Sequence, residues 1–143
     1  MCRGKDRFKK EVELYFGYLD SCLDSKPWEP FEKDFRKDYH RQNGVYLISE
    51  LGEDVGMRYI GKSYQNLEKN PGLYDRLGGH WNSIDRGWSP RNDSTRKLFR
   101  EGKGANSYWV KCLTNSDGIL EGMEEGYETH LIKRFRLCNL INQ

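Results

Sequence analysis

The chain has 143 residues, 36% of them hydrophobic and 32% charged, a balance that predicts one soluble globular domain with a modest core. The net charge of +2 neither requires nor excludes nucleic acid as a partner. No apolar run approaches about 18 residues and no apolar stretch follows the N-terminus, so we expect a cytoplasmic protein with no membrane span and no secretory signal.

The cysteines predict neither a disulfide framework nor a zinc site. They lie far apart, form no C-x-x-C pair and have no zinc-finger spacing with the histidines. We interpret them as buried thiols of a reducing, intracellular protein.

Residues 1–43 are rich in charges of both signs and predict a helical extension. Apolar residues at helical spacing predict an amphipathic helix over residues 5–24: Phe8, Val12, Tyr15 or Phe16, Leu19 and Leu23. Two prolines then interrupt the pattern, and aromatic residues predict a second short helix at 31–39. We interpret 1–43 as an addition to a core spanning 44–143, both within a single domain.

A β-hairpin is predicted over residues 44–63. Residues 44–49 and 57–63 are rich in apolar, aromatic and β-branched side chains, and a glycine-containing turn separates them. Because side chains alternate along a strand, Tyr59 and Gly61 should share one face of the second strand.

The rest of the chain predicts helices around one more strand. A turn at 70–72 should begin a helix over 73–84, on which Arg76 and His80 lie one turn apart. Further elements are expected in chain order: a short helix at 93–100, a third strand at 107–113 and a helix at 119–135.

These segments carry motifs that resemble those of the GIY-YIG nuclease superfamily. Gly44-Val45-Tyr46 is followed, after twelve residues, by Tyr59-Ile60-Gly61. Arg76 and His80 match the family's R-x-x-x-H pattern, Glu128 begins an E-x-x-L-I-K-like segment, and Asn142 follows two apolar residues. The resemblance covers about 100 residues and implies an α+β fold with a small three-stranded antiparallel sheet flanked by helices. The glutamate-to-asparagine spacing is slightly long, so Asn139 remains an alternative to Asn142.

Glu128 is the candidate metal ligand. It lies beside the apolar stripe of its helix, where a carboxylate is at a cleft edge or in an ion pair. Phosphodiester hydrolysis commonly uses a divalent cation, and hard cations prefer oxygen ligands, so we expect Mg²⁺ or Mn²⁺ there. A buried ion pair is the alternative; Glu124 is the spare ligand, and Glu121 and Glu125 are expected to be solvated.

The remaining candidate catalytic residues each have a structural alternative. Arg76 suits a phosphate oxygen, although most helix arginines are simply exposed. His80 could position water or accept a proton, or only pack. Tyr46 and Tyr59 would place two phenols at one site, or be ordinary strand residues. The resemblance implies that Tyr46 orients or deprotonates water, which requires a nearby cation, and Lys62 is the expected one.

Residues 86–111 have a local excess of positive charge with interspersed aromatics, which is typical of a surface for a nucleic-acid backbone. The alternative is a solvated basic loop. The candidate DNA-binding residues are Arg86, Arg91, Arg96, Lys97, Arg100 and Lys103.

The expected function is therefore that of a metal-dependent DNA endonuclease of the restriction type. A homodimer is a possible form of this enzyme. The alternatives are a structure-selective repair or mobile-element nuclease, and a nucleic-acid-binding module that does not cleave. A third hypothesis is an α+β interaction protein with its tryptophans at an interface: Trp28, Trp81, Trp88 and Trp109.

Overall fold

The computed structural model describes residues 3–32, 34–39, 41–63, 72–86, 104–138 and 140. Its longer helices are α1 (Arg3–Asp24), α2 (Leu73–Arg86) and α4 (Glu124–Arg134). Its strands are β1 (Glu29–Pro30), β2 (Gly44–Ser49), β3 (Met57–Ser63) and β4 (Trp109–Thr114). Short 3-10 turns are η1 (Phe35–Tyr39), η2 (Asp54–Gly56), η3 (Ala105–Ser107) and η4 (Asn115–Asp117). In these described ranges, no helix combines the length and apolarity that crossing a membrane requires.

The fold is α+β, as predicted, but the prediction of three strands was wrong. The sheet is antiparallel with four strands in the order β1-β4-β2-β3. The additional strand is short: Glu29 pairs with Val110 and Pro30 with Trp109. A proline lacks the N–H that a central strand needs, but it is tolerated in an edge strand such as β1.

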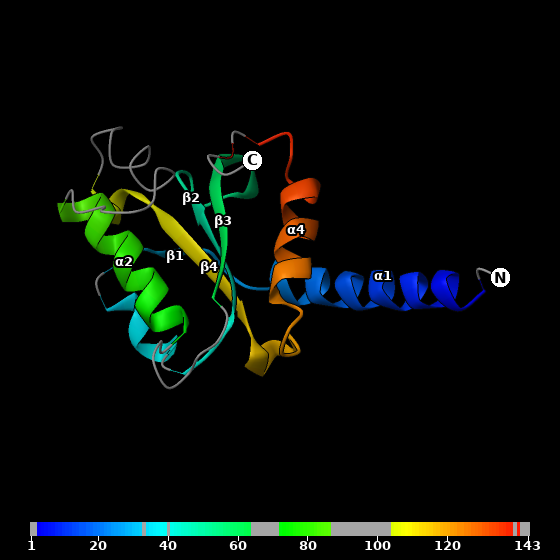
Figure 1. The fold of residues 1–143 in the computed structure, drawn as a ribbon. Helices are drawn as coiled ribbons and strands as arrows, with labels where there is room; N and C mark the ends of the chain where they lie inside the picture. The colour runs from blue at the N-terminus through cyan, green and yellow to red at the C-terminus, as the bar shows by residue number, and fades with distance from the viewer. Residues whose placement is uncertain are drawn as a thin grey trace.

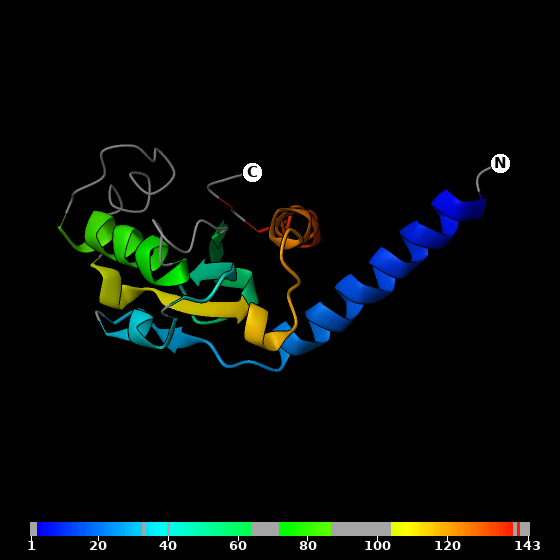
Figure 2. The ribbon, with the colours of Figure 1, turned by 60° about the horizontal axis from the view of Figure 1, so that its bottom comes forward.

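The two hairpin strands are confirmed at their predicted bounds, and β2 is buried along its whole length. Its side chains alternate between two cores. Tyr46 and Ile48 belong to the core under α2, whereas Val45 and Leu47 belong to the core under α1 and α4. Figures 1 and 2 show the sheet between α2 on one side and α4 on the other. β3 is the outer strand of this sandwich.

The last helix begins later than predicted. Residues 119–123 are not helical, and α4 starts at Glu124. Gly122 has a φ of +88°, a left-handed conformation that interrupts a helix. Ile119, before this glycine, is buried in the core under α1 and α4. Periodicity alone predicted a continuous helix because the apolar residues of both segments happen to share the helical spacing.

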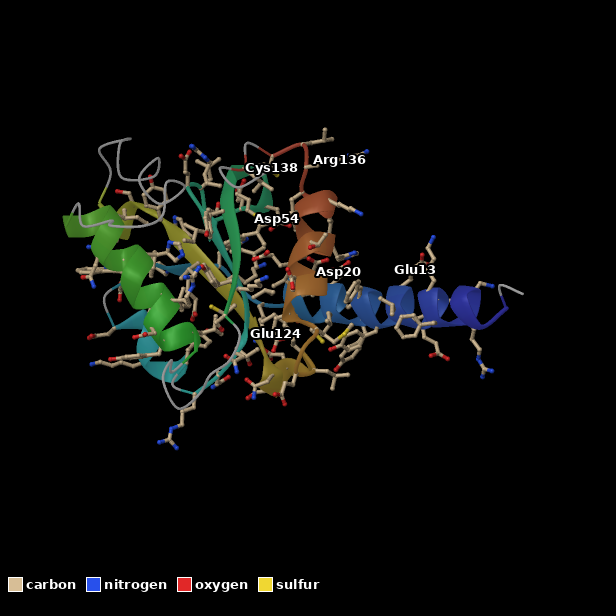
Figure 3. The ribbon with its side chains drawn as sticks, in the orientation of Figure 1. Glu13, Asp20, Asp54, Glu124, Arg136 and Cys138 are labelled. Atoms are coloured by element: carbon tan, nitrogen blue, oxygen red, sulfur yellow. The ribbon has the colours of Figure 1, made fainter. Side chains whose placement is uncertain are left out.

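An ionic network holds α4 against the C-terminal half of α1. The Asp20 carboxylate accepts a hydrogen bond from Tyr127 at 2.8 Å and lies 2.8 Å from Nε2 of His130. Arg134 reaches the same carboxylate at 3.4 Å and donates to Asp24 at 2.8 Å. Figure 3 shows Asp20 where the two helices meet. This contact fixes the helix that carries Glu128.

Candidate active site at the edge strand

Three aromatic side chains from different elements meet under α2. The hydroxyl of Tyr46 lies 2.6 Å from Nε2 of His80, and the rings of Tyr46 and Tyr59 stack with centroids 6.0 Å apart. The ring of His80 lies 4.9 Å from that of Tyr59. All three side chains are buried, with Tyr46 fully so. The structure therefore brings together three of the residues that the sequence singled out.

Gly61 provides the space for this cluster. It is the cross-strand partner of Tyr46, and the tyrosine ring lies directly over its Cα. A Cβ at position 61 would lie 2.3 Å from Cζ of Tyr46, far inside van der Waals contact. The space beside this glycine is therefore filled by a side chain of the same sheet.

Burial keeps both members of the Tyr46–His80 pair neutral. Loss of hydration raises the pKa of Tyr46 well above its usual value, against the smaller effects of the charge and hydrogen bond of Arg76, which lower it. Burial, with the positive charge of Arg76, also lowers the pKa of His80 to about 3. Arg76 itself is exposed at the surface of α2. The pair thus consists of a phenol and a neutral imidazole beside a solvent-accessible cation.

Lys62 does not take the position beside Tyr46 that the sequence suggested. Side chains alternate along β3, so Lys62 points to the α4 side of the sheet, whereas Tyr59 and Gly61 face α2. Its Nζ lies 3.3 Å from Oε1 of Glu125. The cation that acts on Tyr46 is Arg76, which the hairpin motif alone could not reveal.

Glu128 lies on the α4 side of the sheet, and positively charged side chains on both faces of β3 affect its pKa. It is half-buried, and burial raises the pKa of its carboxyl group. The positive charges of Lys62 and Arg76 lower this pKa, and the negative charge of Glu125 raises it. The charge of Arg76 thus lowers the pKa of a group under α2 and of a group on α4.

A pocket of about 400 Å³ lies beside this site, and among the described residues it is lined by Lys62, Gly122, Glu124 and Glu125. Glu124, at the start of α4 in Figure 3, is buried and its carboxylate accepts a hydrogen bond from the Gly122 N–H at 2.9 Å. Glu125 is exposed, as expected, but its pairing with Lys62 was missed. Glu125 lies three residues before Glu128 on one helix, and this spacing was the sequence signal that Glu125 is a neighbour of the candidate site.

These side chains fit a hard divalent cation held through few protein ligands. A half-buried carboxylate with raised pKa gains from a nearby positive charge, and Mg²⁺ in phosphate-processing sites commonly uses one or two carboxylates with water and phosphate oxygens. Within the described ranges, no three histidine, cysteine or acidic side chains converge on one point. Glu128 is the protein ligand that these observations favour.

Several predicted residues lie outside what the structure describes. The side chain of Arg86, at the end of α2, is among them. So are both candidate asparagines, the predicted helix at 93–100 and the remaining basic candidates: Arg91, Arg96, Lys97, Arg100 and Lys103.

Comparisons with protein-family models, with curated proteins and with solved structures found no match to this chain.

Proposed function

We propose that this protein is a metal-dependent DNA endonuclease of the GIY-YIG type that cuts at specific sites. The observation that carries the proposal is the 2.6 Å contact between Oη of Tyr46 and Nε2 of His80, one helical turn from the exposed Arg76. A phosphodiester bound by this arginine would lie beside the phenol–imidazole pair, and Glu128 is the carboxylate proposed to hold a cation. Phosphodiester hydrolysis commonly uses such a set of groups: one for the phosphate charge, one for the attacking water and one for a cation.

Arg76 binds a non-bridging oxygen of the scissile phosphate. Its guanidinium is exposed, planar and permanently charged, so it can donate two parallel hydrogen bonds to a phosphate. Burial is the main cause of the low pKa of His80, and the negative charge of the bound phosphate offsets the second cause, the positive charge of Arg76. Substrate binding therefore makes the imidazole a better proton acceptor than it is in the free protein.

Tyr46 orients the attacking water as a neutral phenol. Because its pKa is raised by burial, a phenolate is not the resting form. As the water oxygen attacks phosphorus, the bond from phosphorus to the leaving oxygen breaks, and the leaving oxygen takes a proton from solvent. The proton of the attacking water moves to Oη of Tyr46, and the phenolic proton moves to Nε2 of His80 along their 2.6 Å contact. Tyr59 packs against both rings and holds the pair in place.

Glu128 would hold a Mg²⁺ or Mn²⁺ ion. When bound, this ion supplies charge neutralisation at the phosphate and stabilises the leaving oxygen. Burial raises the pKa of the Glu128 carboxyl group, the charge of Lys62 lowers it and that of Glu125 raises it, and this balance sets the pH at which Glu128 becomes available as a ligand.

A nucleic-acid-binding module that does not cleave is the second candidate. The observation that favours it is the burial of both Tyr46 and His80, which closes the proposed acid–base pair to bulk water. Arg76 and the basic residues of 86–103 would then bind a backbone without chemistry.

Cleavage of supercoiled plasmid and phage DNA with Mg²⁺, Mn²⁺ or EDTA tests these candidates. Discrete metal-dependent fragments that Glu128→Ala abolishes and the exposed control Glu121→Ala retains would support the site-specific endonuclease. Nicking without discrete fragments would favour a structure-selective repair or mobile-element enzyme. DNA binding without any cleavage would favour the non-cleaving module.

A further inference from the structure

Helix α1 carries its charges in two blocks of opposite sign. Residues 3–10 contain five basic residues and one acidic residue, whereas residues 11–24 contain four acidic residues and no basic one. A helix dipole favours the opposite order, with acidic side chains near the N-terminus and basic ones near the C-terminus. The order of charges in α1 is thus unfavourable for the helix by itself.

Part of this acidic block is compensated within the molecule. Asp20 and Asp24 pair with side chains of α4. The charges at the junction of the two blocks lie outside this network. Arg7 and Glu11 pair with each other along the helix, at 3.6 Å, with most of both side chains exposed. These exposed charges are accessible to a partner outside the fold.

The N-terminal half of α1 projects away from the body of the molecule, as Figures 1 and 2 show, and Glu13 lies on the projecting part in Figure 3. Contacts with the body begin at Tyr15, whose hydroxyl donates to the carbonyl of Gly118 at 2.7 Å. Before that residue, Phe8 is 68% exposed and Leu14 is 75% exposed. A helix segment this short is marginal in water without packing.

Phe8 also continues the apolar stripe that buries Leu19 and Leu23 in the core. Successive members of the stripe are three or four residues apart, the spacing that forms a continuous face on a helix. The stripe therefore extends beyond the body of the domain onto a segment that the domain does not cover.

We propose that the projecting half of α1 pairs with α1 of a second copy of this chain, in antiparallel orientation. A two-fold axis across the pair places the basic block of each copy against the acidic block of the other, so one symmetric contact compensates both. A parallel pair would place like charges together. The overlap also covers Phe8 of both copies, which lies on the apolar stripe of α1.

A second copy fits this surface better than nucleic acid does. A phosphate backbone would be attracted to residues 3–10 but repelled by Glu11 and Glu13, which continue the same exposed segment. Only a partner with both signs of charge in the reverse order complements the whole segment, and α1 itself has that order. The proposal does not depend on the enzymatic activity of the site.

Sedimentation equilibrium of the full chain, over a wide concentration range at low and high salt, tests the proposal. We expect a mass of twice the 16.9 kDa monomer at low salt, with dissociation as salt screens the two blocks. A protein that remains monomeric at every concentration at low salt would overturn the proposal.

Charge-reversal variants test the charge pairing between the two helices. Arg7→Glu with Lys9→Glu and Lys10→Glu makes residues 6–13 acidic at every charged position, and Glu11→Lys with Glu13→Lys makes residues 7–13 basic at every charged position. Each variant alone should be monomeric, because every pairing opposes like charges. An equimolar mixture of the two should form a heterodimer. Variants that stay dimeric alone, or a mixture that stays monomeric, would refute this interface.

Two more variants separate the interface from effects on folding. Phe8→Ser keeps every charge and alters a side chain that is exposed in the single chain, so it should raise the dimer dissociation constant about tenfold or more with unchanged helical circular dichroism. Lys37→Glu reverses an exposed lysine on η1 and is the matched control for the charge-reversal variants. It should leave the dimer intact. Unchanged dimerisation of Phe8→Ser would contradict the proposal.

Discussion

The ring of Tyr46 fills the space above Gly61, so that a Cβ at position 61 would lie 2.3 Å from Cζ and 2.4 Å from Oη of the tyrosine. The ring cannot easily move away, because it is fully buried and its hydroxyl contacts Nε2 of His80. The Gly61–Tyr46 pair therefore couples the stability of the hairpin to the geometry of the candidate site.

Gly61→Ala should lower the free energy of unfolding by about 1–3 kcal/mol, the range typical of overpacking a well-packed core. Urea unfolding of the wild type and the variant measures this difference. Gly79→Ala is the control, because a Cβ there meets nothing within 4 Å and alanine is the better helix former. Equal stability of Gly61→Ala and the wild type would show that the Tyr46 ring is free to shift.

His80 should make the protein less stable as the pH falls below about 6.5, the ordinary pKa of an unfolded histidine. Its pKa in the fold is about 3, so between these values the unfolded chain binds more protons than the native one. Stability from this residue is complete above pH 6.5 and is lost progressively toward pH 3.

The variant His80→Gln isolates this contribution from the carboxylates that titrate in the same range. Chemical unfolding at several pH values should show the wild type losing its stability advantage over the variant as the pH falls from about 6.5 to 4. A difference between the two proteins that is constant over this range would mean that His80 is not held neutral by burial.

Asp20→Asn should destabilise the contact between α1 and α4. The carboxylate of Asp20 serves three side chains of α4, and loss of its charge weakens the contacts with both His130 and Arg134. We expect a loss of about 1–3 kcal/mol by chemical unfolding. Asp34→Asn removes an exposed carboxylate paired with Lys37 and should change stability by less than about 0.5 kcal/mol.

Lys62 and Glu125 should move the pKa of Glu128 in opposite directions. Lys62→Met removes a charge that lowers this pKa and should shift the acid limb of Mn²⁺ binding to higher pH. Glu125→Gln removes a charge that raises it and should shift the same limb to lower pH. Calorimetric titration of the metal at several pH values measures both shifts. Shifts of the same sign would exclude the charge arrangement described around Glu128.

Local patterns were enough to predict the hairpin and the helix carrying Arg76 and His80. Residues 44–49 and 57–63 form the expected strands, because period-two alternation and β-branched side chains act over a few neighbouring residues. The spacing of Arg76 and His80 placed them one turn apart on α2 for the same reason. The meeting of Tyr46, Tyr59 and His80 follows from that local order once α2 covers the sheet.

By itself, the sequence thus determined the periodic elements and the residue types available to the site. Only the tertiary structure decided which distant segments pair and what surrounds each charge. Strand β1 exists because two residues near the N-terminus reach β4, and Lys62 meets Glu125 because α4 covers its face of the sheet. The neutrality of Tyr46 and His80 likewise depends on burial by several elements at once. Periodic elements follow from the spacing of apolar residues along the chain, which acts locally. The hydration and the electrostatic environment of each side chain arise only once all the elements are packed together.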